Sequence, residues 1–139
     1  MNISTKRNIS KLITIMLFLF FLFANIYAIR RLGYYAVELF FYDKLSVAYQ
    51  VGGRSGLNNE LDRILSQTDM PRQLALAKTF KKDLPNIEEP VKFLNNSIQE
   101  KKNEINLFRA LRNGAFICIL VLVLLRLALN FYVKPLAKL

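Results

Sequence analysis

The longest apolar run in the chain lies near its C-terminal end and extends from Gly114 to Val133, with Arg126 as its one charged residue. A helix that crosses a bilayer needs about 20 mostly apolar residues. Lipid offers no hydrogen-bond partners, so each backbone polar group must be satisfied inside the helix. The run therefore predicts a transmembrane helix over residues 114–133.

A second apolar run covers Leu12 to Ile29, holds 18 uncharged residues and is closed by Arg30 and Arg31. It predicts a first transmembrane helix over residues 12–29. The alternative is a cleavable signal peptide, with Ile26-Tyr27-Ala28 as its cleavage site. Because the run is longer than the usual apolar core of about 7–15 residues in a signal peptide, a retained span is favoured.

The segment after Gly33 keeps apolar residues on one side of a predicted helix. Val37, Phe40, Phe41 and Leu45 are spaced by three or four positions, which is typical of a helix with one buried face. We expect this helix to continue the first span outward. A face with such bulky side chains predicts a surface that covers a partner or rests on the membrane. The alternative is packing against the returning helix of the same chain.

Glycine and proline divide the rest of the chain. The run Gly52 to Gly56 holds three glycines in five residues, which predicts a turn between helices. A short amphipathic helix follows, and Pro71 begins another that stops at Leu84-Pro85. Strand-like alternation is not seen at any length, so the predicted fold class is all-α.

The last predicted helix begins after this second proline break. Asn86 and Glu89 have the spacing of a capping box, and Pro90 suits a first-turn position. An apolar stripe then runs from Val91 into the second span, interrupted at Lys101. The simplest interpretation is one helix from about Ile87 to Val133.

Charge gives the two spans an orientation. The chain has 139 residues and a net charge of +10, yet its two tails hold only basic charges. The positive-inside rule places both tails, residues 1–11 and 134–139, in the cytoplasm and residues 30–113 outside. We therefore expect an all-α membrane protein with two antiparallel transmembrane helices joined by an extracytoplasmic helical segment. The basic residues of the two tails and of the second span are Lys6, Arg7, Lys11, Arg126, Lys134 and Lys138.

Small residues predict where the two spans meet. Ala24 and Ala28 lie four positions apart near the outer end of the first span, and Ala110, Gly114 and Cys118 repeat this spacing near the outer end of the second. Small side chains let helix backbones approach closely in lipid. We expect the two rows to form a helix-packing contact.

Arg126 is the costly residue of the second span, since a central arginine costs about 2.5–3.5 kcal/mol on insertion scales. It lies close to Val133, so its long side chain is expected to reach the cytoplasmic phosphates. Pairing with an acidic residue on another subunit is the alternative, because neither span contains one. Proton or ion transport is a third interpretation.

Candidate chemistry is scarce. The chain has no histidine and one cysteine, Cys118, which lies inside the second span. These residues build no disulfide and no Cys/His metal site, so we expect no enzymatic activity and no cofactor. A metal site made of carboxylates alone is the alternative, although the spacing of the acidic residues does not suggest one. The basic charge would suit nucleic acid in a soluble chain. Here 53% of the residues are hydrophobic, and the region between the spans is only mildly positive, so no nucleic-acid partner is expected.

The layout resembles the two-span sensor half of chemoreceptors and sensor kinases. In those families a Pro-Leu-x-x-Leu sequence often opens the HAMP signalling module just inside the membrane, and Pro135-Leu136-Ala137-Lys138-Leu139 matches it. The resemblance implies perception of a signal in the periplasm, and we expect the bacterial inner membrane as the location.

The function favoured by the sequence is a small non-enzymatic accessory subunit of a larger membrane protein complex. Its partners would be the lipid bilayer and other integral membrane subunits or further copies of itself. The sensor half of a signal-transducing receptor is the alternative.

Overall fold

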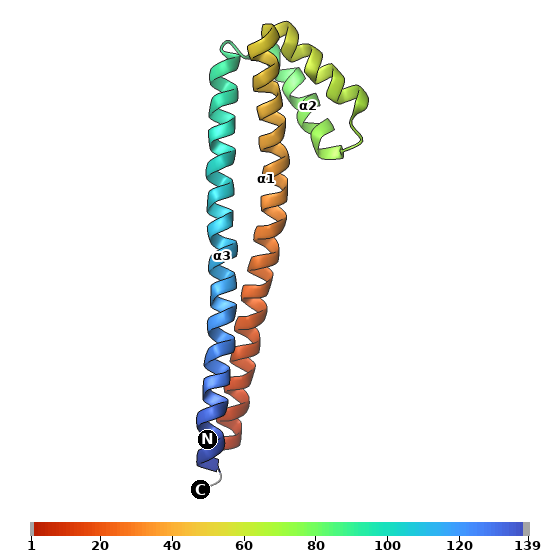
Figure 1. Cartoon of the computed structure of the whole chain (residues 1–139). Coiled ribbons are helices and arrows are strands. Elements are labelled where there is room, and N and C mark those ends of the chain that lie inside the picture. Colours follow the sequence, from red (N-terminus) through yellow and green to blue (C-terminus); the bar gives the residue numbers. More distant parts are fainter. Residues whose placement is uncertain (1, 138–139) are drawn as a thin grey trace. The chain divides into compact units, whose positions relative to one another are not determined.

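The computed structural model describes residues 2–137, with side chains as far as Tyr132. It contains α1 (Ile3–Gln67), α2 (Pro71–Asp83), the 3-10 helix η1 (Leu84–Asn86) and α3 (Pro90–Ala137) (Figure 1). No strand occurs within the described range, so the all-α prediction is confirmed. By length and composition, α1 and α3 are each apolar enough to cross a membrane.

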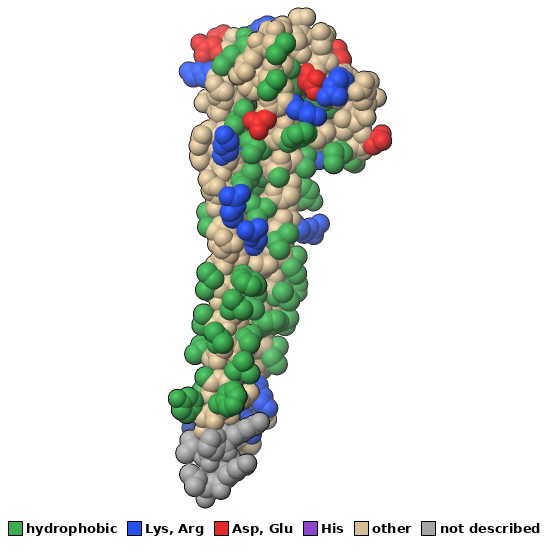
Figure 2. Space-filling view, viewed as in Figure 1, with side chains coloured by type: hydrophobic (Ala, Val, Ile, Leu, Met, Phe, Trp, Pro, Cys, Tyr) green, Lys and Arg blue, Asp and Glu red, His purple; other side chains and the backbone are tan. Residues whose placement is uncertain are grey.

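The chain divides into two compact units. The first, called here the two-helix unit, comprises Met1–Arg31 and Phe108–Leu139, and the second, the core unit, comprises Leu32–Leu107. The two-helix unit holds both apolar runs, and only 6% of the residues in the most apolar window of each helix are buried. Figure 2 shows its apolar side chains facing outward. A soluble protein would bury most of such a helix.

The helices of the two-helix unit pack along faces that repeat every three or four residues. On α1 the face includes Thr14, Asn25 and the fully buried Ala28. On α3 the buried residue is Ala115. Spacing of three and then four keeps one seam of each helix against its neighbour. The partly buried residues of the α3 face are Phe108, Arg112, Ile119, Leu122 and Arg126.

The core unit is built around a cluster of nine buried apolar residues. These come from both halves of α1, from α2, from η1 and from the start of α3. The ring of Phe80 lies 6.3 Å, centroid to centroid, from that of Phe41 inside the cluster and 5.7 Å from that of Phe93 at its exposed edge. The nine residues are Phe41, Leu45, Leu57, Leu61, Ile64, Ala77, Phe80, Leu84 and Leu94.

The predicted turn at Gly52–Gly56 is confirmed. Gly53 alone leaves the helical conformation, with φ 61° and ψ −148°, a region open essentially to glycine. Gly56 has a different role: a Cβ atom there would lie 2.5 Å from the carbonyl oxygen of Ala48. The two halves of α1 therefore cross closely just after the turn, which brings Leu57 and Leu61 onto the core.

Prolines set where the later helices begin. Pro71 opens α2, as the sequence predicts. Pro90 opens α3, so the capping box at Asn86 is wrong: Asn86 ends η1, and Ile87 is extended. The residue before a proline is driven out of the helical region. Glu89 consequently stays outside α3, and the last helix starts three residues later than the spacing of Asn86 and Glu89 predicts.

Candidate functional site

The core unit contains one buried charged side chain among its described residues, the carboxylate of Glu38 on α1. One oxygen accepts a hydrogen bond from Nη2 of Arg72 on α2, and the other lies 3.0 Å from Nζ of Lys101 on α3. Two cations from two further helices thus compensate the buried charge. Removing one partner of such a pair typically costs about 3–5 kcal/mol. Glu38 therefore fixes the relative positions of the three helices in this unit.

Neighbouring side chains extend this ion pair. Nζ of Lys101 is also 3.2 Å from Glu104 and 5.3 Å from the ring centre of Tyr35, and the guanidinium of Arg72 lies 4.6 Å from the ring centre of Tyr34. Partial burial alone would lower the pKa of Lys101, but the hydrogen bonds that its ammonium donates to the carboxylates of Glu38 and Glu104 raise it overall. Lys101 is thereby held in its charged form.

Tyr42 lies beside this network. Burial raises the pKa of the Tyr42 hydroxyl, and the negative charge of Glu38 raises it further. Both oxygens of Glu38 already bind cations. The arrangement is therefore suited to holding the three helices together.

Arg54 anchors the connection between α2 and α3. Its guanidinium donates hydrogen bonds to the carbonyl oxygens of Leu84 at 3.3 Å, of Ile87, and of Glu88 at 3.3 Å. Carbonyls at the end of a helix otherwise have no partner within the helix. Because Arg54 directly follows Gly53, the turn of α1 and the α2–α3 connection are tied together.

The predicted partner surface divides between two faces of α1. Phe41 and Leu45 are buried in the core, so for these two residues the structure corrects the surface prediction in favour of packing within the chain. Phe40 is 52% exposed and Val37 is partly exposed. Val47 and Val51 continue the face of Phe40 and are 59% and 85% exposed. We call Val37, Phe40, Val47 and Val51 the apolar stripe.

The predicted small-residue contact is partly replaced. Ala28 is fully buried and Ala24 partly buried. On α3, however, Ala110 and Gly114 are exposed, and a Cβ atom at Gly114 would meet nothing within 4 Å. Ala115, one position along, is the buried small residue. Of the predicted α3 row, Cys118 is partly buried, whereas Ala110 and Gly114 lie on a face of α3 that is turned away from α1.

Polar and aromatic contacts accompany this packing. The Asn25 side-chain amide on α1 donates a hydrogen bond of 2.9 Å to the carbonyl oxygen of Arg112 on α3. The rings of Tyr27 and Phe108 lie 6.0 Å apart. Interhelical hydrogen bonds of this kind stabilise helix pairs in lipid.

Arg126 lies where two grooves of the two-helix unit meet. One groove, the apolar groove, is lined almost wholly by apolar atoms. The other, the basic groove, is lined by three basic side chains, two uncharged polar side chains and Ile15. Thr14, Ile15 and Arg126 line both. The apolar groove is also lined by Phe18, Leu122, Val123 and Leu127, and the basic groove by Arg7, Lys11 and Asn130.

The remaining candidates are limited. Cys118 is a free, partly buried thiol. Within residues 2–137, no group of three or more potential metal ligands of the His, Cys, Asp and Glu types was found. Of the HAMP-like sequence, Lys138 and Leu139 lie outside the described residues, and the side chains of residues 135–137 are not described.

Sequence reasoning missed the Glu38 network, although a signal for it existed. Glu38 lies among the regularly spaced apolar residues of its helix, and Lys101 interrupts the apolar face of α3. When two opposite charges each lie within an apolar face, pairing them with one another avoids leaving either charge buried and uncompensated.

Comparison of the chain with protein-family models, with curated proteins and with solved structures found no match.

Proposed function

We propose that this protein is a non-enzymatic accessory subunit of a larger membrane protein complex. Its two apolar segments cross the membrane, and its core unit presents the apolar stripe of α1 to a neighbouring membrane subunit. The observation that carries this proposal is the exposure of the stripe, whose valines and phenylalanine are outside the core although they lie on a helix that contributes to it.

Membrane insertion is supported by the apolar surface of the two-helix unit, where leucine, isoleucine and phenylalanine side chains are exposed on both helices. Figure 2 shows apolar side chains on the face in view. The antiparallel pairing is supported by the order of the contacts. Asn25 binds Arg112, whereas Thr14, earlier in α1, shares a groove with Arg126, later in α3. Contacts that run in opposite sequence order are those of antiparallel helices.

Docking through the stripe follows from its spacing. Val37, Phe40, Val47 and Val51 recur on one face of α1, with Lys44 between them and its ammonium 4.5 Å from the ring centre of Phe40. Recurrence at three and four residues suits the groove of a partner helix. The core-facing residues Phe41 and Leu45 occupy a different side of α1, so the stripe remains available to a partner.

The test is recovery of partners with the tagged full chain from membranes in a mild detergent. The double variant Phe40→Ser/Val47→Asp should lower the recovery of a specific membrane protein by roughly tenfold, because a carboxylate in an apolar contact has no partner. Val91→Asp is the matched control, since Val91 is similarly exposed but lies on α3. Docking through the stripe would be contradicted if the unsubstituted chain, the double variant and Val91→Asp all recovered the same proteins.

Self-association is tested separately with a new cysteine on the stripe. In a Cys118→Ser background, Val47→Cys should leave the chain monomeric under oxidising conditions if the partner is a different protein. A disulfide-linked dimer in membranes would instead identify a second copy of this chain as the partner. Val91→Cys serves as the control for random collision.

A further inference from the structure

We propose that the two-helix unit binds one anionic phospholipid in the two joined grooves beside Arg126. The phosphate lies in the basic groove against Lys11 and Arg126, and one acyl chain lies in the apolar groove. The proposal rests on the membrane insertion proposed above, but it is independent of partner docking.

The basic groove gathers cations from both helices. Arg7 and Lys11 come from α1 and Arg126 from α3, with Thr14 and Asn130 as further polar neighbours. No acidic side chain occurs in residues 1–31 or 108–139. This unit therefore has no carboxylate side chain of its own to compensate the three cations. Negative charge must come from outside it, and the basic groove is complementary to a phosphate diester.

The apolar groove supplies the second half of the recognition. It is lined by Ile15 and Phe18 of α1 and by Leu122, Val123 and Leu127 of α3. Thr14, Ile15 and Arg126 belong to both grooves, so the two surfaces adjoin. A phosphate joined to a hydrocarbon chain matches this change of polarity. A free phosphate would leave the apolar groove without an occupant.

The helical spacing repeats this order on each helix. On α1, Lys11 precedes Ile15 by one turn, and on α3 Arg126 follows Leu122 and Val123 by one turn. In both cases the cation lies nearer the chain terminus than these apolar residues, and Leu127 directly follows Arg126. The two helices therefore present headgroup and acyl-chain contacts in the same order, as a lipid aligned with the spans requires.

The headgroup arm of the test compares lipids bound to the purified full chain in detergent, by native mass spectrometry. The probes are phosphatidylglycerol, phosphatidylcholine and inorganic phosphate. Phosphatidylglycerol should be retained more strongly than phosphatidylcholine. Each cation near an anionic lipid contributes about 1 kcal/mol, so Lys11→Gln/Arg126→Gln should weaken retention by roughly 25-fold.

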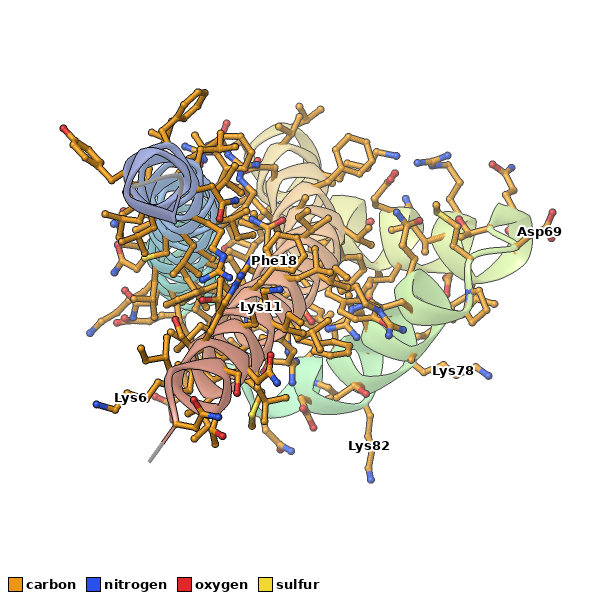
Figure 3. All side chains as sticks on the ribbon, turned by 90° about the horizontal axis from the view of Figure 1, so that it is seen from below. Lys6, Lys11, Phe18, Asp69, Lys78 and Lys82 are labelled. Carbon is orange, nitrogen blue, oxygen red and sulfur yellow. The ribbon has the colours of Figure 1, made fainter. Side chains whose placement is uncertain are left out.

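Lys6→Gln is the matched control for this arm. Lys6 lies on the same stretch of α1 but lines another groove, with Ile9 and Ile13, and it extends outward in Figure 3. It should keep the preference for phosphatidylglycerol. The proposed lipid site would be overturned if Lys6→Gln lost as much phosphatidylglycerol as the double variant, or if the chain retained the two lipids equally. It would also be overturned if inorganic phosphate displaced phosphatidylglycerol as well as added phosphatidylglycerol does.

The acyl-chain arm uses a second matched pair. Val123→Phe places a ring in the apolar groove and should weaken retention of phosphatidylglycerol, whereas Val121→Phe, which is as exposed but outside the groove, should not. Equal retention of phosphatidylglycerol by both variants would overturn the placement of the acyl chain in the apolar groove. Membrane fractionation of every variant separates these outcomes from a failure of insertion, which would instead refute the proposed transmembrane arrangement.

Discussion

At the scale of single residues, the glycines of the α1 turn have different physical roles. Gly53 supplies a backbone conformation, with a φ of 61°, whereas Gly56 supplies space against the Ala48 carbonyl. Gly52 does neither, because a Cβ atom there meets nothing within 4 Å. The composition of the run predicts a turn, but it does not tell these roles apart, since they depend on how the two halves of α1 cross.

These roles predict different effects of alanine. Gly56→Ala should destabilise the core unit by about 1–3 kcal/mol, because the new methyl group collides with backbone. Gly52→Ala should be neutral or stabilise the helix by up to about 1 kcal/mol. Thermal unfolding of the full chain in detergent, followed by circular dichroism, measures both. Equal melting temperatures for the two variants would refute the close crossing at Gly56.

Two side chains of the core unit predict a loss of stability in alkali. The pKa values of Tyr42 and Lys101 are both raised above their ordinary values of 10.0 and 10.5, so the folded unit holds these protons more tightly than the unfolded chain. Their contribution is complete below the ordinary values and is lost as pH rises through the raised ones. The melting temperature should therefore fall as the pH rises above about 10, the ordinary pKa of tyrosine.

Tyr42→Phe is the variant that isolates part of this effect. Without the hydroxyl, the fall in melting temperature over the same alkaline range should be smaller than in the unsubstituted chain, and stability near neutral pH should change little. Tyr132→Phe is the control, because Tyr132 lies in the two-helix unit and is largely exposed. An identical alkaline fall in all three chains would exclude a contribution from Tyr42.

At the scale of elements, the sequence predicted the helices well and their contacting faces less well. The apolar runs, Gly53 and Pro71 mark boundaries by local chemistry, which a sequence displays directly. Pro90 overrode the capping box at Asn86, because a proline constrains the residue before it regardless of side-chain spacing. Which face of α3 meets α1 depends on the partner helix, so Gly114 and Ala115 could not be distinguished by spacing of four alone.

This correction gives a test at adjacent positions of α3. Ala115→Leu should lower the stability of the two-helix unit by about 1–3 kcal/mol, because Ala115 is buried and the larger side chain overpacks the contact. Gly114→Leu should be tolerated, since that position faces open space. Unfolding of the detergent-solubilised chain compares them. Greater damage from Gly114→Leu would restore the originally predicted contact face.

At the scale of the whole molecule, the acidic side chains are confined to one part of the chain. All ten acidic side chains lie between Glu38 and Glu104, which is within the core unit. The pattern of charges predicted a polar segment between two spans, but the identity of its core residues required the fold. Phe41 and Leu45 illustrate this, because their periodicity matched an outer partner and a chain-internal contact equally.

The proposed orientation is testable in sealed cells. In a Cys118→Ser background, Ser4→Cys should resist an impermeant thiol reagent, because the basic N-terminal tail is expected in the cytoplasm. Ser55→Cys, an exposed position in the core unit, should react. Lysis should make Ser4→Cys reactive as well, which controls for a buried thiol. Labelling of Ser4→Cys before lysis would refute the cytoplasmic placement of this tail.

The ion pairs of Glu38 also impose an order on biosynthesis. The ribosome delivers Glu38 first, Arg72 34 residues later, and Lys101 last. A chain still being made therefore holds this acid without its second cation, and leaving a buried charge uncompensated is unfavourable. The core unit should fold only once the first turns of α3 have emerged from the ribosome. A nascent chain from which Lys101 has not yet emerged should therefore be cleaved readily by proteases, whereas one from which Lys101 has emerged should begin to resist them.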